Sequence, residues 1–395
     1  MPQLESPENS SVILTRAAYV SFVPIGIGTV LLGPMLPSLS TRWALDYAQA
    51  GALFTAQYLA STCAVALSGF LVSRFGFRFA MKLGIFLMAA GIALLMEGPR
   101  FLGILCIALY GGGIGLAVPA ANLLVAELNP GRRSATLNWL NFYWSAGAVS
   151  CPFLISWASR HQQVPLFLRL VAVLSLAVAF GIALIPGHVV EPKTQSPGQS
   201  AMPAVQQKLF PFLALAALFF VYVGTENSFG GWVASYAKAL GNMSPAESLM
   251  TPSFFYASLM VGRLFAPAIL RIVNDIALAK LGLILACGGT AGLLLSGGLT
   301  GVIASACATG FGLSGVYPIT IALFSREFGS ASSRLGSVMF VLSNIGGGLL
   351  PWIVGVFSSR QGTLKAGLYM PVIGCAAMLA LYLRDWTEPE ARQRA

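Results

Sequence analysis

Residues 69–78 have the sequence GFLVSRFGFR, which is a short basic turn between two long apolar runs. The run before the turn covers about residues 48–72, and the run after it covers about residues 79–97. Each run is close to the length of about 20 residues that an α-helix needs to cross a bilayer. Membrane-spanning strands are about 10 residues long and alternate in polarity, so this stretch predicts a helical hairpin in a membrane.

The composition of the whole chain agrees with this prediction. Of its 395 residues, 56% are hydrophobic and 9% are charged, whereas a typical soluble domain carries about 25% charged residues. The net charge of +10 comes from basic residues that lie mostly between apolar runs, where they act as orientation signals. We therefore exclude a sizeable soluble domain and expect the chain to bind no nucleic acid.

Working outward from the turn, the sequence predicts an all-α polytopic membrane protein with twelve transmembrane helices in two sets of six. The first set covers about residues 17–39, 48–72, 79–97, 101–126, 135–159 and 166–186, and the second about residues 209–236, 250–272, 276–296, 299–324, 332–358 and 363–384. The division is therefore an N-terminal six-helix half (1–186), a cytoplasmic linker (187–208) and a C-terminal six-helix half (209–395). Proline, glycine and serine in the linker favour a flexible connection.

The distribution of Lys and Arg predicts the orientation of the chain. Of the 23 basic residues, 15 fall in segments on the side of the termini, seven fall in the opposite loops, and Arg263 lies within a span. Because basic residues are retained on the cytoplasmic side, we expect both termini in the cytoplasm. The expected location is the plasma membrane, which in a bacterium is the inner membrane, and we expect a monomer.

The two halves carry an internal repeat. The pairs at an offset of 199 residues are Gly113–Gly312, Pro119–Pro318, Leu124–Leu323, Gly147–Gly346 and Pro152–Pro351, and those at an offset of 198 are Lys82–Lys280, Gly84–Gly282 and Gly91–Gly289. Single matches of this kind mean little, but a constant spacing over a long stretch indicates a repeated unit. Parallel six-helix repeats are a transporter construction in which the substrate is held near the midplane between the halves.

The turn at residues 69–78 also carries a family resemblance. It matches the pattern G-x-L-x-D-R-x-G-x-R of the major facilitator superfamily at Gly69, Arg74, Gly76 and Arg78, and departs from it at Ser73, where the family has an acidic residue. The chain resembles that superfamily over nearly its whole length. The resemblance implies two pseudo-symmetric six-helix bundles, and it implies that the motif helps the protein to change between inward- and outward-facing states.

A second stretch is similar to the fucose–proton symporter group of that superfamily. Residues 222–236 have the sequence YVGTENSFGGWVASY, and residues 262–264 are Gly-Arg-Leu. This resemblance implies transport of hexoses or deoxyhexoses, generally with protons. Such symporters can place an acidic residue in the first span or mid-way along the fourth, and neither position is acidic here.

Two ionisable side chains, Glu226 and Arg263, fall inside predicted spans. A charged group there costs about 3 kcal/mol on insertion scales, so such groups are functional candidates by default. We expect Glu226 and Arg263 to take part in proton coupling or substrate binding. The alternative is a structural role, in which the two form an ion pair or bind backbone carbonyls.

Amides and aromatic side chains gather in the span at about residues 135–159. Asn138, Asn141 and Ser145 are three and four residues apart, so they share one helical face, with Trp144 beside them. Amides next to an indole suit a sugar, but membrane Asn residues also form hydrogen bonds between helices, and both roles stay open. The candidate substrate-binding residues are Asn138, Asn141, Trp144, Tyr222, Glu226, Asn227, Gln57 and Asn344.

Other classes of function lack the residues that they need. The six cysteines form no CxxC pair, and His161 and His188 lie far apart, so we expect no metal site. The glycines of residues 111–115 follow no strand, so they predict close helix packing and not a nucleotide site. We expect no cofactor and no enzymatic activity. A secondary transporter of a small polar solute, most simply a monosaccharide, is the leading hypothesis. The alternatives are drug efflux by the same fold, transport of another solute such as an organic anion, and a non-transporting receptor or integral membrane enzyme.

Overall fold

The computed structural model describes residues 7–185, 208–329 and 332–384, and these residues are helical with short connections. The N-terminal half consists of α1 (Pro7–Val30), α2 (Leu32–Arg42), α3 (Tyr47–Phe75), α4 (Phe77–Leu94), α5 (Arg100–Leu128), the 3-10 turn η1 (Pro130–Arg132), α6 (Arg133–Arg160) and α7 (Val164–Leu184). The C-terminal half consists of α9 (Leu209–Ala239), α10 (Pro245–Ile269), α11 (Asp275–Leu295), α12 (Leu299–Leu313), α13 (Val316–Phe328), α14 (Ser332–Gln361), α15 (Leu364–Gly367) and α16 (Tyr369–Leu383). The expected linker lies almost wholly outside the described residues.

Ten helical segments of the described residues are long and apolar enough to cross a membrane. The pairs α1–α2, α12–α13 and α15–α16 each form one crossing, so α6 and α10 complete the twelve that the sequence predicts. These two helices fall short in hydropathy because they carry polar side chains such as Asn138, Asn141 and Arg263. They also pack against each other across the two halves, so the least apolar spans lie at the interface between the halves.

Proline explains the three breaks within crossings. Proline has no N–H to donate to the carbonyl four residues earlier. Pro34 follows the end of α1 at Val30 by four residues, Pro318 follows the break at Ser314, and Pro371 follows the end of α15 at Gly367. The sequence analysis treated each of these crossings as one continuous run, because hydropathy does not register a local break.

The internal repeat is confirmed by helix contacts. In the N-terminal half, Gly84 of α4 and Gly113 of α5 approach so closely that a Cβ on either would strike the backbone of the other. Gly282 of α11 and Gly312 of α12 make the same approach in the C-terminal half. The repeated glycines are therefore packing positions, as close helix approach in membranes requires.

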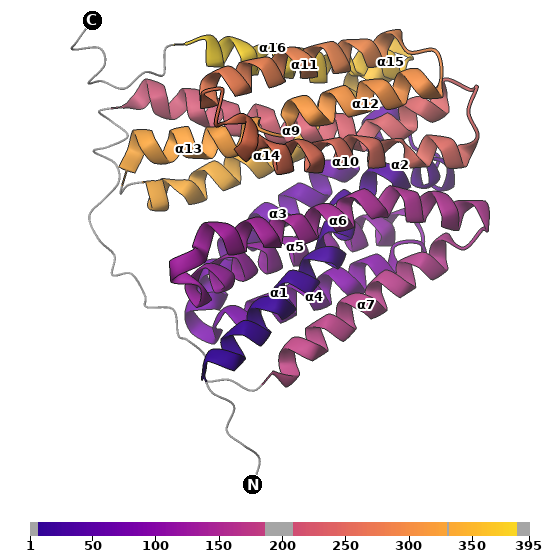
Figure 1. The fold of residues 1–395 in the computed structure, drawn as a ribbon. Helices are drawn as coiled ribbons and strands as arrows, with labels where there is room; N and C mark the ends of the chain where they lie inside the picture. The colour runs from indigo at the N-terminus through magenta and orange to yellow at the C-terminus, as the bar shows by residue number, and fades with distance from the viewer. Residues whose placement is uncertain (1–6, 186–207, 330–331, 385–395) are drawn as a thin grey trace, which may run out of the picture.

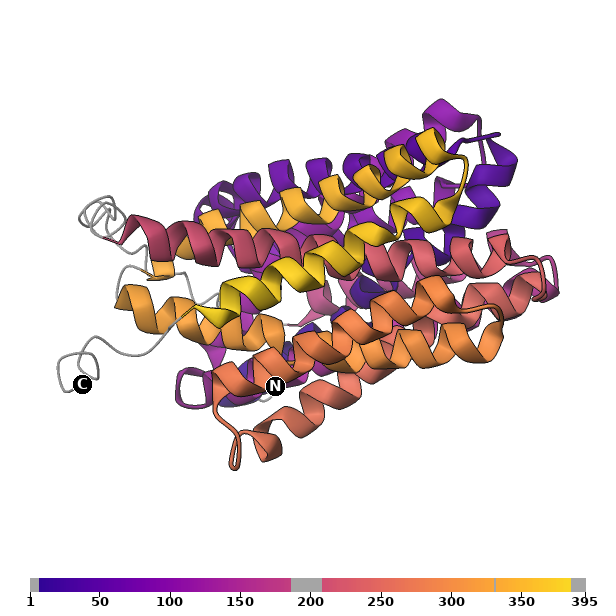
Figure 2. The same cartoon turned by 90° about the horizontal axis from the view of Figure 1, so that it is seen from above.

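The two halves form two bundles of long helices, α1–α7 and α9–α16, which run roughly along one direction (Figures 1 and 2). The bundles touch through α3 with α14, α6 with α10 and α2 with α9. In Figure 1 they converge at the right and separate toward the left, where α1 starts and α16 ends. The fold thus places its functional surfaces along the interface between the bundles.

Candidate functional site between the two halves

The halves meet at the end formed by the starts of α3 and α10 and by the ends of α6, α9 and α14, which we call the closed end. The hydrogen bonds that cross between the halves there join Ala48 N to Ser359 Oγ (2.8 Å), Thr55 Oγ1 to the Gly348 carbonyl (3.1 Å), Ser156 Oγ to the Ala246 carbonyl (2.7 Å), Ser253 Oγ to the Val149 carbonyl (2.8 Å) and Lys238 Nζ to Thr41 Oγ1 (3.3 Å). All of them lie at the end away from the termini. The halves are therefore bonded to each other at that end, and the other end, where the ribbons of the two bundles separate (Figure 1), is called the open end below.

Glycine allows the helices of the closed end to pack backbone to backbone. Gly51 of α3 lies against Trp352 of α14, Gly355 of α14 lies against Tyr47 of α3, and a Cβ on either glycine would strike the opposite main chain. Gly33 of α2 approaches the backbone of α9 in the same way. Any larger side chain at these positions would force the closed end apart.

The cross-half contact that reaches furthest along α3 is made by Tyr58. Its hydroxyl donates a 2.7 Å hydrogen bond to Oδ1 of Asn227 on α9. The ring lies against Gly347 of α14, and the Tyr58 Cβ lies beside Gly348. Asn227 directly follows Glu226, so this contact joins the N-terminal half to the segment that carries the membrane-embedded carboxylate.

Glu226 lies among aromatic hydroxyls and one cation. It interacts electrostatically with Tyr58 of α3, Tyr222 of α9, Tyr256 and Arg263 of α10, and Tyr317 of α13. The Glu226 and Arg263 side chains are both half-buried. These four helices belong to both halves, so Glu226 lies where the bundles meet.

The carboxylate and the guanidinium of this cluster do not form an ion pair. Both side chains are described, and no Glu226 oxygen lies within 4.0 Å of an Arg263 nitrogen. Tyr222 lies within interaction range of both groups, yet its Oη and the Arg263 Nε, both buried, make no hydrogen bond of standard geometry among the described residues. Because an unpaired buried polar atom costs about 1–3 kcal/mol, the C-terminal wall has free capacity to bind a polar molecule.

The N-terminal wall of the junction is uncharged and internally bonded. Trp144 Nε1 donates to Thr29 Oγ1 at 3.3 Å, and the Thr29 hydroxyl donates to the Ile25 carbonyl at 2.7 Å. Gln57 Nε2 donates to the Thr29 carbonyl at 3.3 Å, and Gln57 Oε1 accepts from the Tyr110 hydroxyl at 3.3 Å. Gln57 is 3% exposed, so its amide stabilises this wall in the present conformation.

The amides of α6 face the open part of the interface. On α6, the residues Val149, Phe153 and Ser156 contact α10. Steps of three and four residues lead back from them through Ser145 and Phe142 to Asn138. Asn138 therefore lies on the same stripe of α6, about three turns toward the open end. Asn138 and Asn141 are exposed, and Asn141 Nδ2 donates to the carbonyl of Leu137 in its own helix.

Asn344 lies in a similar position on α14. It precedes Gly348 by one turn, on the stripe of α14 that contacts α3, and it is half-buried. The structure thus brings Tyr222, Glu226, Asn227 and Asn344 to the junction and places Asn138 and Asn141 on its open side. Trp144 and Gln57 lie behind them in the N-terminal wall.

The family motif at residues 69–78 makes contacts only within the N-terminal half in the described structure. Gly69 and Arg74 are exposed, and Arg74 lies over the ring of Phe75. Gly76, with φ of 82°, ends α3 and starts α4, a backbone conformation that favours glycine. The Arg78 guanidinium donates two 2.6 Å hydrogen bonds to the carbonyls of Ile182 and Ile185, so it caps the end of α7.

Sequence reasoning missed Thr29, Tyr110, Tyr256 and Tyr317. A usable signal existed for Tyr256, because it lies seven residues before Arg263 and so shares its helical face. No such signal marks the others as neighbours of the site. Their hydroxyls become relevant only when the helices are packed.

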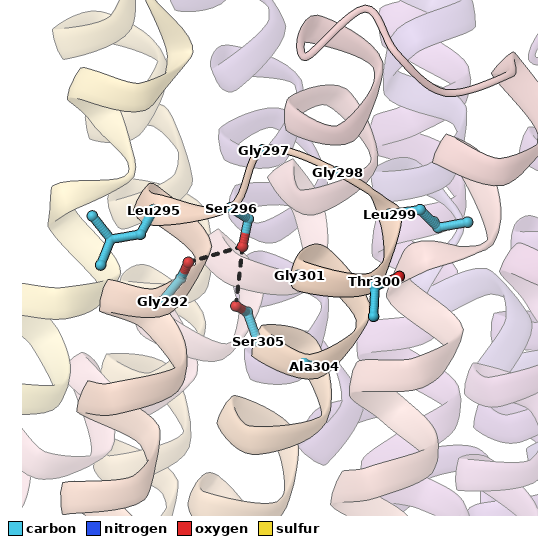
Figure 3. A pocket seen from close by; sticks show the side chains of 10 residues that line it. All are labelled: Gly292, Leu295, Ser296, Gly297, Gly298, Leu299, Thr300, Gly301, Ala304 and Ser305. Atoms are coloured by element: carbon cyan, nitrogen blue, oxygen red, sulfur yellow. Dashed lines mark hydrogen bonds between the residues drawn. The ribbon is translucent and has the colours of Figure 1, made fainter.

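Two surface hollows lie away from this junction. One is lined by the loop and helix ends around Ser296 and Gly297, between α11 and α12, where the Ser296 hydroxyl bonds the Gly292 carbonyl and Ser305 (Figure 3). The other is lined by residues 42–44 and 97–100. Among the described residues, no group of three or more His, Cys, Asp or Glu side chains could hold a metal ion.

Comparison with known proteins gives the same family along most of the chain. The profile of the Major Facilitator Superfamily matches residues 18–351. The glucose/galactose transporter of Brucella abortus biovar 1 is 27% identical, over 96% of this chain and 95% of that protein. Protein TsgA of Escherichia coli O1:K1 is 25% identical, over 94% of this chain and 95% of that protein.

Solved structures share the fold. The transporter FucP, in its outward conformation, is 18% identical and superposes with a TM-score of 0.66 over 95% of this chain and 99% of its own. The nucleoside transporter NupG is 14% identical, with a TM-score of 0.72 over 95% of this chain and 98% of its own. The D-xylose–proton symporter is 16% identical, with a TM-score of 0.73 over 94% and 96%.

Proposed function

The chain belongs to the major facilitator superfamily, and we propose that it is a secondary transporter that moves a monosaccharide across the membrane together with a proton. The observation that carries the proposal is the junction itself. Glu226 and Arg263 lie close together without an ion pair, beside the unpartnered Tyr222 hydroxyl. Sugar hydroxyls both donate and accept hydrogen bonds, so they match this mixture of carboxylate, guanidinium and phenol.

The names of similar proteins support the same substrate class. The Brucella relative is a glucose/galactose transporter, and the D-xylose–proton symporter shares the fold. Trp144, held by its bond to Thr29, and the exposed amides of Asn138 and Asn141 add the aromatic and amide groups that suit a sugar. A pocket for amphipathic drugs would be mostly apolar, so we place drug efflux second.

The proposed orientation follows from the basic residues. With both termini in the cytoplasm of a bacterial cell, the closed end faces outward and the open end faces the cytoplasm. The described conformation then corresponds to the state that releases substrate inside. Transport requires the closed end to open and the opposite end to close around the same site.

Proton coupling is proposed for Glu226, with Arg263 as its partner. As an anion, Glu226 is attracted to the Arg263 guanidinium, and as a neutral acid it loses this attraction. Its protonation therefore changes the forces between α9 and α10 at the point where sugar would bind. A carrier in which one residue responds to the proton and borders the sugar can link the two movements.

The test uses the purified full chain in proteoliposomes with radiolabelled D-glucose and D-galactose. We expect wild-type protein to exchange one of these sugars and to accumulate it under an inwardly directed proton gradient. Glu226→Gln should retain exchange and lose gradient-driven accumulation. Wild-type protein without sugar exchange would exclude the substrate class, and full accumulation by Glu226→Gln would exclude its coupling role.

A further inference from the structure

Tyr58 has a counterpart in the C-terminal half. The helices α3 and α10 start 198 residues apart, at Tyr47 and Pro245. Equivalent glycines support this alignment, since each packs against the backbone of the residue before the tyrosine. The two contacts are Gly111 against the Gln57 carbonyl and Gly310 against the Phe255 carbonyl. Tyr58 and Tyr256 are therefore related by the repeat, and both interact electrostatically with Glu226.

The two tyrosines use their hydroxyls differently. The Tyr256 hydroxyl lies against Gly230 within the C-terminal half, where a Cβ on that glycine would come within 2.5 Å of it. The Tyr58 hydroxyl instead crosses to the other half and donates to Asn227. Asn227 is held in turn by its own Nδ2, which donates to the Val223 carbonyl at 2.8 Å.

On these grounds we propose that Tyr58 is a positioning residue for proton-coupled transport: through Asn227, it makes closure of the outward-facing end depend on the state of Glu226. This inference rests on the proposed function. The Tyr58–Asn227 bond exists only when the closed end is closed, because its two residues belong to different halves. It therefore contributes to the equilibrium between the two transport states.

The link to Glu226 follows from helix geometry. Asn227 is adjacent to Glu226 on α9, so a movement of this helix segment that takes Glu226 toward or away from Arg263 also moves Asn227. The groups that face Glu226 are Tyr58 from α3, Tyr222 from α9, Tyr256 and Arg263 from α10, and Tyr317 from α13. Among these groups, Tyr58 alone belongs to the opposite half. It is therefore the one through which the protonation state of Glu226 can affect the contact between the halves.

The chain offers a matched control for Tyr58. Thr55 lies one turn earlier on α3, and its hydroxyl also crosses to the other half, where it donates to the Gly348 carbonyl at 3.1 Å. Thr55 lies outside the cluster around Glu226. Tyr58→Phe and Thr55→Val each remove one cross-half hydrogen bond from the same face of the same helix, but only the first removes a group that faces Glu226.

The experiment compares these variants in proteoliposomes by sugar exchange and by proton-driven accumulation. Tyr58→Phe should keep exchange within about threefold of wild type and lower the accumulation ratio by about tenfold, the equivalent of one hydrogen bond. Thr55→Val should keep both within about threefold, because the cross-half bond that it removes does not face Glu226. Equal behaviour of the two variants would overturn the inference, because a simple adhesive contact predicts it.

A double variant separates this inference from the proposed function. If Tyr58 acts through Glu226, then Tyr58→Phe should change nothing further in a Glu226→Gln background. An effect of Tyr58→Phe that persists in that background would overturn the inference while leaving the function intact. Full accumulation by Glu226→Gln alone would instead contradict the proposed function.

Discussion

The two halves share a scaffold, but the side chains with which they line the junction differ in charge and in hydrogen bonding. The N-terminal wall is uncharged, and the side-chain groups of Trp144 and Gln57 are hydrogen-bonded within it. The C-terminal wall carries Glu226 and Arg263, and it leaves buried polar atoms without partners. A bonded wall is fixed in shape, whereas a wall with unpaired charges can rearrange when a proton or a ligand arrives.

The repeat positions show where this difference arises. Packing glycines are retained at the offset of 198–199 residues, and they make the same contacts in both halves. At the candidate site the repeat retains a tyrosine pair, Tyr58 and Tyr256, but not the charged and amide side chains. At the offset of α3 and α10, Arg263 corresponds to Val65, and Gln57 corresponds to Phe255. The repeat therefore specifies the framework, and the site depends on residues that differ between the halves.

The largest effect should follow removal of the cation from the C-terminal wall. Arg263→Met keeps the length of the side chain and leaves Glu226 without its positive neighbour. Because the Glu226 carboxylate then loses the nearby positive charge that stabilises its ionised form, we expect loss of proton-driven accumulation together with a lower melting temperature. The double variant Arg263→Met/Glu226→Gln should recover much of the melting temperature.

Thermal unfolding in detergent measures this recovery. Equal melting temperatures for the single and double variants would show that Glu226 and Arg263 do not interact in the folded protein. The comparison between the walls would then lose its electrostatic basis.

How far the sequence predicts this site depends on the kind of information each residue carries. Hydropathy, basic residues and the repeat predict the twelve crossings, because these signals are local. Glu226 and Arg263 were identifiable because charge inside a span is rare. The contact of Tyr58 with Asn227 was not predictable, since it depends on how two separately folded halves dock. The hydrogen bonds of the Gln57 amide were also not predictable from the sequence, because its partners lie on two other helices.

A smaller effect is expected for the amides on the open side. Asn141 is exposed, and its described bond is to its own helix, so it does not join helices in this conformation. Asn141→Ala should raise the dissociation constant for sugar by about five- to hundred-fold, as loss of one buried hydrogen bond to a ligand predicts. The melting temperature should stay close to that of wild type. Unchanged binding with a lower melting temperature would instead indicate a role in helix packing.

The smallest effect on transport should come from the N-terminal wall. Gln57→Leu removes the amide that bonds the Thr29 carbonyl and accepts from the Tyr110 hydroxyl. Since both partners are then left unsatisfied in a buried region, unfolding should become easier by about 1–3 kcal/mol. Sugar affinity should change by less than about fivefold, because the hydrogen bonds of the amide are made to residues of the wall and not to the ligand. The dependence of accumulation on pH should match that of wild type, because no charge is altered. A large loss of affinity without a loss of stability would mean that Gln57 turns toward the sugar, and the N-terminal wall would then be a binding surface that rearranges as the C-terminal wall does.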